Sequence, residues 1–532
     1  MAQFKSEKIC LVILDGWGIG QKNFSNPIYQ ADLKFIKEIE QNYPLLSLQA
    51  SGTAVGLPYN QAGNSEVGHL TLGTGQIYYQ YPVRISQSIQ NGTFFQNPTL
   101  LNIYQFVKNN QSALHLVGLF SDSIVHSSYD HLLALLDLAK KFDLKKVYLH
   151  LITDGRDSSP QEAQKLIPKL LEDIRIRGRG EIASLGGRFY AMDRDKNYNR
   201  TEKYYNLLVF GKGKVVSDPQ KYLSESYASG ITDEFILPAL IGDSQEPSSL
   251  KTFQEGDGVV FFNFREERMR QLLEPFFMEN FSYFPTKKFQ NLKIVTFTKY
   301  RKDFPFPVAF LPQSIEVCLA KLLSSVGKRQ IHIAETEKFV HVTYFFNGLK
   351  ENPFPGEYWV AVPSIKALRI DSYPALRARE VTNRTLQAME ENIYDFILIN
   401  YANGDLIGHT GNFQAGIQAA KVIDEELKKL VINGLDFGYT LLITSDHGNL
   451  EQMKNPLNAE VDTEHNNNLV PFYFVDKRAK LKEPRKEEEV YDFKMVASGM
   501  LSDVSPTILD LLGLEASKEM TGQSLLPILE IF

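Results

Sequence analysis

Cysteine is scarce in this chain of 532 residues, which contains only two. Cys10 and Cys318 lie far apart, and no C-x-x-C pair occurs. This pattern excludes a disulfide framework and a thiolate zinc site, and it is typical of a reducing compartment. We therefore expect a cytoplasmic protein.

Long apolar runs and a strong net charge are also missing. The apolar run that follows "MAQFKSEKIC" stops at Asp15, so it predicts neither a signal peptide nor a membrane span. The formal net charge of −6 is small for this length, which argues against nucleic acid or an anionic membrane as a partner. Hydrophobic residues at 43% and charged residues at 23% are typical of a soluble globular protein. The length predicts two or more domains.

Strand-like apolar runs alternate with amphipathic helical stretches over most of the chain. Helices are predicted near 27–40, near 160–175, from about 265, and over 413–430. The runs are continuously apolar, as in strands that are covered on both faces. We therefore predict an α/β fold with mostly parallel sheets. The strand-like runs are "KICLVILD", "KKVYLHLITDGRD", "GVVFFNFRE", "RQIHIAETEK", "YDFILINYANGD" and "YTLLITSDHGN".

Two segments resemble linkers, one near 76–84 and one near 303–312, and the second contains three prolines. A pair of linkers is what an inserted domain requires, because the chain must cross the same boundary twice. We predict one domain from 1–78 plus 312–532, and an inserted domain over 79–311. The charged segment 476–490 is expected to be a solvated excursion without an assigned function.

Polar residues interrupt the ends of several predicted strands. Taken singly, each has an ordinary explanation as a helix cap, a turn residue or a surface histidine. As a set they supply carboxylate and imidazole without thiolate, which suits Mn²⁺, Zn²⁺ or a related divalent ion at the carboxyl ends of the strands. The number of groups is about enough for two ions that clamp a transferring phosphoryl group. The set comprises Asp15, Asp405, His409, Asp446, His447 and His465.

A second set of residues, mostly in the predicted inserted domain, is rich in arginine. Guanidinium groups match carboxylate and phosphate geometry, so arginines at strand ends predict a small, multiply anionic ligand. Any one of them, taken alone, is more simply a solvated side chain. The set comprises His126, Arg156, Asp157, Arg188, Arg194, Arg265, Arg268 and, outside the insertion, Lys338.

Two glycine-rich stretches allow competing interpretations. "GWGIG" at 16–20 suggests dinucleotide binding, but its spacing is not G-x-G-x-x-G, so we expect no nucleotide and assign the glycines to a sharp turn beside Asp15. "QAGNSEVGHL" at 61–70 contains Ser65 without the G-x-S-x-G pattern, and taken alone it predicts a flexible surface loop.

Together these stretches resemble the cofactor-independent phosphoglycerate mutases, a branch of the alkaline-phosphatase superfamily. The resemblance covers nearly the whole chain and follows the family's order. The motifs are "LDGWGIG", "GNSEVGHLTLGTGQ", "GRFYAMDRD", "FFNFREER", "EKFVHVTYFFNG", "ENPFPGE", "NGDLIGHTG" and "TSDHGN".

The resemblance implies an alkaline-phosphatase-like metal domain, an inserted phosphotransferase domain and interconversion of 3-phosphoglycerate and 2-phosphoglycerate in glycolysis, without bisphosphoglycerate. It implies Ser65 as the nucleophile that becomes phosphoserine, and two divalent ions, usually Mn²⁺. One ion is expected on Asp405, His409 and His465. The other is expected on Asp15, Asp446, His447 and the Ser65 oxygen. The arginine-rich set is expected to surround the phosphoglycerate, with Arg265 and Lys338 neutralising charge and Asp157 moving protons; a monomer is expected.

Other interpretations remain open at this stage. A metal-dependent phosphatase or a sugar-phosphate mutase of the same superfamily would share the metal residues, and a non-catalytic metal-binding protein would share the fold. The chain also departs from the family's usual pattern before His126 and at Leu349, Gly404 and Asn466. We expect Gly63 and Gly68 to give the backbone freedom near Ser65, and His69 to have only a structural role.

Overall fold

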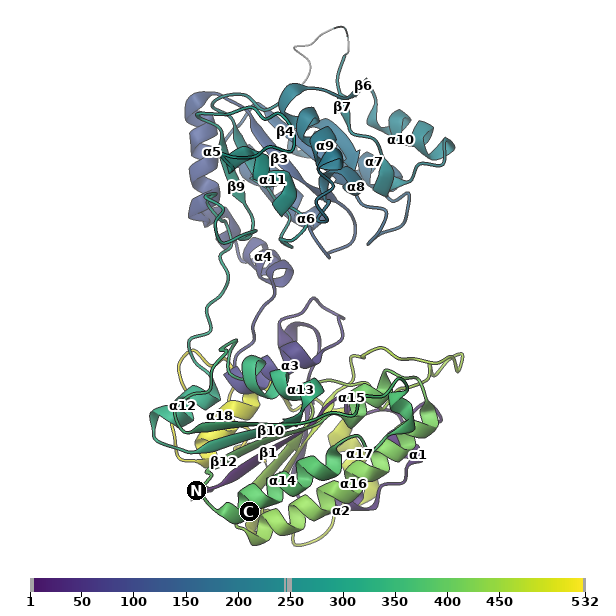
Figure 1. Cartoon of the computed structure of the whole chain (residues 1–532), viewed down its shortest axis with the longest axis vertical. Coiled ribbons are helices and arrows are strands. Elements are labelled where there is room, and N and C mark those ends of the chain that lie inside the picture. The colour runs from purple at the N-terminus through teal and green to yellow at the C-terminus, as the bar shows by residue number, and fades with distance from the viewer. Residues whose placement is uncertain (1–3, 244, 246–250, 530–532) are drawn as a thin grey trace. The chain divides into compact units, whose positions relative to one another are not determined.

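The computed structural model describes residues 4–243, 245 and 251–529. The chain divides into two compact units, unit 1 from Met1–Gln80 with Gln313–Phe532 and unit 2 from Tyr81–Pro312 (Figure 1). The first boundary falls inside the first predicted linker, and the second falls at the end of the other. No helix in the described ranges combines the length and the apolar character needed to cross a bilayer.

Unit 1 is built on a sheet of strand order β11-β10-β12-β1-β13-β14-β2-β15. The pairs are parallel except those that β14 makes with β13 and β2. Its strands are β1 (Ile9–Leu14), β2 (Leu45–Gln49), β10 (Gln330–Glu335), β11 (Glu357–Val362), β12 (Phe396–Tyr401), β13 (Thr440–Thr444), β14 (Val470–Val475) and β15 (Gly499–Met500).

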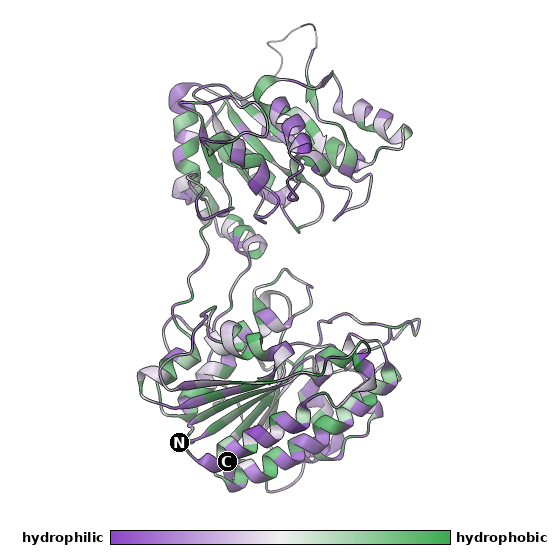
Figure 2. Cartoon of the chain, viewed as in Figure 1, coloured by the Kyte–Doolittle hydropathy of each residue, from purple (hydrophilic) through white to green (hydrophobic). Residues whose placement is uncertain are grey.

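Helices cover both faces of this sheet, which explains the continuously apolar strands. Alternate residues of β1 enter two different hydrophobic clusters, one with α2, α14 and α16 and the other with α3, α12 and α18. Figure 2 shows the strands of this sheet as predominantly hydrophobic ribbons. The helices of unit 1 are α1 (Pro27–Gln30), α2 (Lys34–Asn42), α3 (Ser65–Thr74), α12 (Leu319–Ser325), α13 (Thr336–Val340), α14 (Ala378–Glu391), α15 (Asn403–Gly408), α16 (Phe413–Asp436), α17 (Glu487–Met495) and α18 (Val504–Leu511).

Unit 2 has a separate sheet of order β6-β7-β5-β4-β3-β8-β9, parallel except where β7 meets β5. Its strands are β3 (Leu114–Phe120), β4 (Val147–Thr153), β5 (Glu181–Gly187), β6 (Lys214–Val216), β7 (Ala239–Ile241), β8 (Gly258–Phe261) and β9 (Lys293–Thr296). Its helices are α4 (Tyr81–Gln90), α5 (Pro98–Asn110), α6 (Tyr129–Lys141), α7 (Ala163–Arg177), α8 (Arg188–Ala191), α9 (Tyr198–Phe210), α10 (Pro219–Ala228) and α11 (Arg270–Phe277).

The predicted α/β class with mostly parallel sheets is confirmed, while some predicted element boundaries are wrong. The helix expected over 27–40 is split between α1 and α2 at Asp32, whose φ of 49° is incompatible with a continuous helix. The helix expected from about 265 begins only at Arg270.

The charged segment 476–490 is a solvated excursion only in part. Most of its side chains are exposed, but its last residues, 487–490, form the first turn of α17. In that turn Val490 is buried against the core, and four residues later the ammonium group of Lys494 lies 2.6 Å from the buried Glu40 carboxylate. The end of the segment is therefore part of the packed structure of unit 1.

Candidate active site

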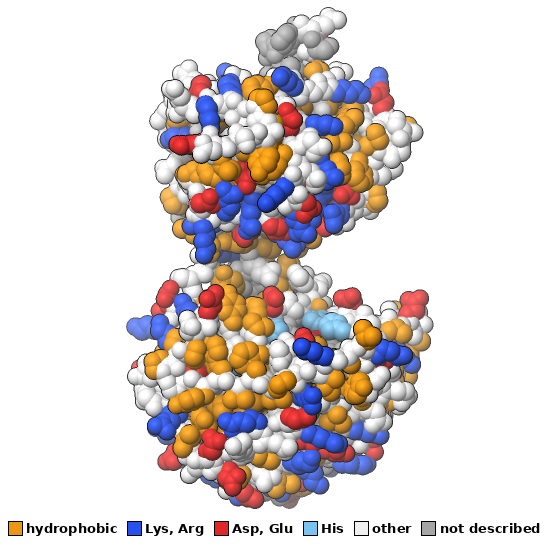
Figure 3. Space-filling model, viewed as in Figure 1, with side chains coloured by type: hydrophobic (Ala, Val, Ile, Leu, Met, Phe, Trp, Pro, Cys, Tyr) orange, Lys and Arg blue, Asp and Glu red, His pale blue; other side chains and the backbone are white. Residues whose placement is uncertain are grey.

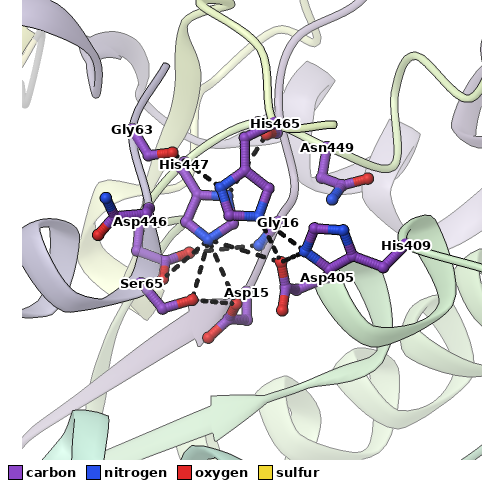
Figure 4. A network of polar contacts seen from close by, with 12 residues as sticks. Asp15, Gly16, Gly63, Ser65, Asp405, His409, Asp446, His447, Asn449 and His465 are labelled. Carbon is purple, nitrogen blue, oxygen red and sulfur yellow. Dashed lines mark hydrogen bonds and ion pairs between the residues drawn. The ribbon is translucent and has the colours of Figure 1, made fainter. Parts of the chain in front are cut away.

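The sheet of unit 1 brings the predicted metal ligands to one edge. β1 pairs in parallel with both β12 and β13, so the carboxyl ends of these three strands lie side by side. Asp15 follows β1, Asp405 lies in α15 just after β12, and Asp446 and His447 follow β13. Figure 4 shows the three aspartates around the His447 ring, with Ser65 beside Asp15.

One group consists of Asp405, His409 and His465, whose ligand atoms lie close enough to share an ion. The Asp405 Oδ1 atom lies 2.9 Å from His465 Nε2 and 3.2 Å from His409 Nε2, and the two Nε2 atoms are 2.9 Å apart. Each Nδ1 atom faces a backbone carbonyl, that of Thr463 for His409 and that of Gly63 for His465, both at 2.8 Å.

These carbonyls accept hydrogen bonds from the Nδ1–H groups, so that each Nε2 atom keeps a lone pair when its ring is neutral. Two imidazole lone pairs and a carboxylate oxygen therefore converge on one point. This donor set fits a divalent cation. The His409 side chain is 45% exposed, and histidine side chains are visible at the surface of unit 1 in Figure 3.

A second group lies deeper and includes Ser65. The Ser65 Oγ atom is 3.0 Å from His447 Nε2 and 3.1 Å from Asp15 Oδ1. His447 Nε2 is also 3.5 Å from Asp446 Oδ2 and 3.8 Å from Asp405 Oδ1, so the two groups adjoin. All of these side chains are buried. The structure thus brings Ser65 and the six predicted ligands into one constellation.

Lys338 lies inside this constellation. It enters from α13, which follows β10, and its Nζ atom lies 2.6 Å from Asp15 Oδ1 and 2.7 Å from both Ser65 Oγ and Asp405 Oδ2. Burial opposes charge on Asp15, but Lys338 and His447 together outweigh it and hold the pKa of this carboxyl well below its ordinary value. Burial lowers the pKa of His447, yet Asp446 and Asp15 outweigh it and raise this pKa to about 9.

Ser65 is the first residue of α3, so the loop suggested by the glycine-rich sequence is wrong. Asn64 caps this helix by accepting a hydrogen bond from the Val67 N–H group at 3.1 Å. Every residue of α3 except Glu66 is buried, so the helix shows no amphipathic stripe. Burial on all sides explains why helical periodicity could not identify it.

Gly63 and Gly68 serve close packing and not the backbone freedom that was expected. Neither has a positive φ. A Cβ atom at Gly68 would lie 2.6 Å from the Asp446 carbonyl oxygen, and one at Gly63 would lie 2.1 Å from the Ala50 carbonyl oxygen. These contacts require glycine because no side chain fits between the backbones.

Backbone N–H groups of the "GWGIG" stretch donate hydrogen bonds to side chains of this protein. Gly16 has a φ of 70°, and its N–H group donates to Asp446 Oδ1 at 3.2 Å. The N–H group of Gly18 donates to Glu451 Oε2 at 2.8 Å, so both amides face carboxylates of this chain. The turn beside Asp15 is therefore built by glycine, as expected.

Glu451 and Asn400 also belong to this network, although neither was predicted as a site residue, and His69 belongs to it although only a structural role was expected. Glu451 follows the "TSDHGN" motif by two residues, and His69 lies one helical turn beyond Ser65. Asn400 is a polar residue within the apolar run of β12. The polar interruption at Asn400 was the one available signal, since nothing in the sequence shows what the other two contact.

In unit 2 the structure brings together His126, Asp157 and Arg188. The Arg188 guanidinium lies 2.5 Å from Asp157 Oδ2 and 3.1 Å from His126 Nε2. Burial and the charge of Arg188 lower the pKa of His126 to about 4. Asp154, which the sequence analysis missed, accepts from Arg188 at 2.6 Å and from the Arg156 and Asp157 N–H groups at 3.2 and 3.0 Å.

The other predicted arginines are more exposed. Arg156 and Arg265 side chains are each 54% exposed, and Arg194 is exposed. Burial lowers the pKa of Arg268, and the nearby positive charges of Arg194, Arg188 and Arg156 lower it further. Four cations therefore lie near one another, which favours an anion in their midst. Arg265 pairs with Glu267 at 2.9 Å instead.

Comparison with known proteins identifies the family of the chain. A family described as "BPG-independent PGAM N-terminus (iPGM_N)" matches residues 85–302. The 2,3-bisphosphoglycerate-independent phosphoglycerate mutase of Moorella thermoacetica is 43% identical over 99% of both chains. The chain belongs to the 2,3-bisphosphoglycerate-independent phosphoglycerate mutases. The mutase of the same name from Clostridium novyi is 43% identical over 97% of this chain and 99% of its own.

A solved mutase structure resembles this chain as well. A crystal structure of Leishmania mexicana phosphoglycerate mutase at low cobalt concentration has 26% sequence identity and a TM-score of 0.55. The match covers 98% of each chain.

The departures from the pattern usual in these mutases have local structural correlates. Leu349 has a φ of 65°, the left-handed region in which glycine is the favoured residue. At Gly404 a Cβ atom would lie 2.4 Å from the Asp15 carbonyl oxygen. In the loop before His126, Ser121 donates to Asp154 at 2.7 Å. Asn466 donates its N–H to the Gly448 carbonyl, next to His447, at 3.3 Å.

Proposed function

We propose that this protein interconverts 3-phosphoglycerate and 2-phosphoglycerate by way of a phosphoserine on Ser65. The observation that carries the proposal is the position of Ser65 Oγ, within 3.1 Å of Asp15, His447 and Lys338 at the buried edge of the sheet. A serine hydroxyl is a weak nucleophile at neutral pH and needs activation by nearby groups.

Two divalent ions fit the donor groups of unit 1. We assign one to Asp405, His409 and His465, and the other to Asp15, Asp446, His447 and the Ser65 oxygen. When bound, the ions supply positive charge that favours the deprotonated serine oxygen and offsets charge on the transferring phosphoryl group. Imidazole with carboxylate suits Mn²⁺, which we propose as the working ion.

Lys338 and Ser65 carry the transfer itself. The Ser65 hydroxyl loses its proton and its oxygen forms a bond to phosphorus as the bond between phosphorus and the glycerate oxygen breaks, and the departing glycerate oxygen takes up a proton to become a hydroxyl. The Lys338 ammonium, 2.7 Å from Ser65 Oγ, is placed to stabilise negative charge there. In the return step, the other glycerate hydroxyl loses its proton and attacks phosphorus, which frees Ser65.

The residues of unit 2 are suited to keep the glycerate between the two transfers. Arg156, Arg188, Arg194 and Arg268 present the cations that a carboxylate requires, and Arg265 is assigned to the phosphoryl group. Asp157 is assigned the proton transfers at the two hydroxyls, with the neutral imidazole of His126 3.4 Å from its carboxylate. Exclusion of water while Ser65 is phosphorylated would prevent hydrolysis.

The setting of this activity also belongs to the proposal. We place the protein in glycolysis and gluconeogenesis in the cytoplasm, acting as a monomer without bisphosphoglycerate or nucleotide. Its partner is the small phosphoglycerate molecule, with no role for nucleic acid or membrane.

An enolase-coupled assay with 3-phosphoglycerate, Mn²⁺ and no bisphosphoglycerate tests the reaction. We expect turnover in the wild type and, in Ser65→Ala, a loss on the order of a thousandfold or more because the acceptor oxygen is gone. Ser224→Ala, an exposed serine on α10, serves as the control and should retain full activity. Inorganic phosphate as the main product would favour a phosphatase instead. Normal turnover by Ser65→Ala would contradict the phosphoserine.

A further inference from the structure

His69 faces the metal constellation from the buried side of α3. Its side chain is fully buried, and its Nδ1 atom lies 2.9 Å from the Ser65 carbonyl oxygen and 3.1 Å from Asp446 Oδ2. Both neighbours can only accept hydrogen bonds when Asp446 is ionised, so Nδ1 must carry the proton. The Nε2 atom of the same neutral ring is then an acceptor.

Asn400 satisfies that acceptor. Its side-chain Nδ2 atom lies 3.0 Å from His69 Nε2 and 2.7 Å from Asp15 Oδ2, so one amide group donates to both. The opposite orientation would set the amide oxygen against the Asp15 carboxylate and the imidazole lone pair, which is unfavourable. The tautomer of His69 and the orientation of Asn400 therefore fix each other.

The result is a buried row of polar contacts from Asp446 through His69 and Asn400 to Asp15, in which His69 Nδ1 lies 3.1 Å from Asp446 Oδ2 and Asn400 donates hydrogen bonds to His69 and Asp15. One oxygen of each carboxylate faces this chain. The other oxygen of Asp15, Oδ1, remains directed at Ser65 and lies 3.5 Å from His447 Nε2. Asn400 lies opposite Ile13 in the register of β12 and β1, so the strand pairing itself sets this spacing.

We propose that His69 and Asn400 are positioning residues that hold Asp15 and Asp446 in the orientation needed by the ion next to Ser65. The inference rests on the proposed two-ion centre and deepens it, and it replaces the expectation that His69 is purely structural. Partners behind metal ligands of this kind affect metal affinity about 10- to 100-fold. The ion assigned to Asp405, His409 and His465 lacks contact with the pair and should be unaffected.

His69 is not proposed as a ligand itself, although Asp15, His69 and Asp446 lie close enough to hold an ion. Its Nδ1 proton is directed at the Ser65 carbonyl, and its Nε2 lone pair accepts from Asn400. No lone pair of the ring remains for a cation.

Calorimetric titration of the metal-free protein with Mn²⁺ separates the two ions. We expect two binding events in the wild type. Asn400→Leu removes both amide donors, and His69→Gln moves the donor away from Asp446. Each of these two variants should lower the Mn²⁺ affinity of one binding event about tenfold or more. The affinity of the other event should stay within about threefold of its wild-type value. His69→Asn keeps an amide near the Nδ1 position and should recover most of the lost affinity.

His332→Gln is the matched control, because His332 is a fully buried histidine of unit 1 whose polar contacts are with Val342, Gln330 and Glu357 and not with the proposed metal ligands. It should bind both ions as the wild type does. Circular dichroism before titration establishes which variants are folded, and if His69→Gln is unfolded, Asn400→Leu and His69→Asn decide the outcome.

Wild-type affinity for both ions in a folded Asn400→Leu protein would overturn the inference, as would an equal loss of both ions. Failure of the wild type to bind two ions would instead reject the proposed two-ion centre.

Discussion

Individual side chains fix the metal constellation through hydrogen bonds that lie behind the ligands. Glu451 is the clearest case, because it is 1% exposed and joins three loops. Its Oε2 atom accepts from the Gly18 and Asn449 N–H groups at 2.8 and 2.9 Å, and its Oε1 atom accepts from Asn468 at 2.9 Å. The loops that follow Asp15, His447 and His465 are thereby tied to one carboxylate.

Replacement of Glu451 by glutamine should loosen these loops. Glutamine has one oxygen where two are needed, so its amide N–H₂ must face a donor, which costs about 1–3 kcal/mol in the free energy of unfolding. Urea unfolding of the metal-free protein, followed by fluorescence of Trp17 and Trp359 in unit 1, measures this loss. Glu425→Gln on the exposed face of α16 is the control and should unfold as the wild type does. Equal midpoints for the two variants would show that Glu451 does not tie the loops.

Neighbouring strands of unit 2 are linked by a buried polar row that crosses the sheet. His115 on β3 lies 3.1 Å from Asp257 and 2.9 Å from His150 on β4, which in turn lies 2.8 Å from Ser184 on β5. All four side chains are buried. Burial lowers the pKa of both histidines, so the row holds neutral imidazole at neutral pH.

The row should make unit 2 less stable in acid. The pKa of a histidine in the unfolded chain is about 6.5, and that of His150 in the folded state is well below it. The contribution of neutral His150 to the free energy of unfolding is therefore complete above about pH 6.5. It is lost as the pH falls, by about 1.4 kcal/mol at about pH 5.5. Hydrogen-exchange protection of β4 at about pH 7.5 and about pH 5.5 measures the loss.

Two variants assign that loss to its source. His150→Gln, which keeps a donor towards His115 but does not titrate, should show a smaller acid-induced decrease by about that amount. Ser184→Ala removes a hydrogen bond but no titrating group, so its acid-induced decrease should match the wild type. An unchanged decrease in His150→Gln would rule out His150 as the source.

At the scale of the whole molecule, the residues with proposed chemical roles are distributed over both units. The proposed metal ligands, Ser65 and Lys338 belong to unit 1, whereas the other members of the arginine-rich set belong to unit 2. Both tryptophans, Trp17 and Trp359, also lie in unit 1, so their fluorescence reports on that unit.

Removal of metal should therefore destabilise one unit selectively. A cation that binds only the folded form raises its stability by mass action, about 2.7 kcal/mol at a hundredfold excess over Kd. Chelation should lower the thermal midpoint seen by tryptophan fluorescence, and added Mn²⁺ should restore it. Hydrogen exchange in β3–β5 of unit 2 is the internal control and should not change. A tryptophan transition that is indifferent to chelator and Mn²⁺ would argue against ions in unit 1.

The sequence by itself determined the α/β class, because continuous apolar runs and helical periodicity are local properties of the chain. It also identified the carboxylate and imidazole groups as candidates, because polar residues at the ends of apolar runs stand out, whereas Ser65 became a candidate only through the resemblance of its motif to the family.

Only the tertiary structure decided why α3 is a helix without a stripe, why Gly68 is glycine, and what His69, Asn400 and Glu451 contact. Lys338 moved from an expected substrate contact into the carboxylate cluster for the same reason. Such contacts join residues hundreds of positions apart, and they follow from strand register and close packing, which no local pattern encodes.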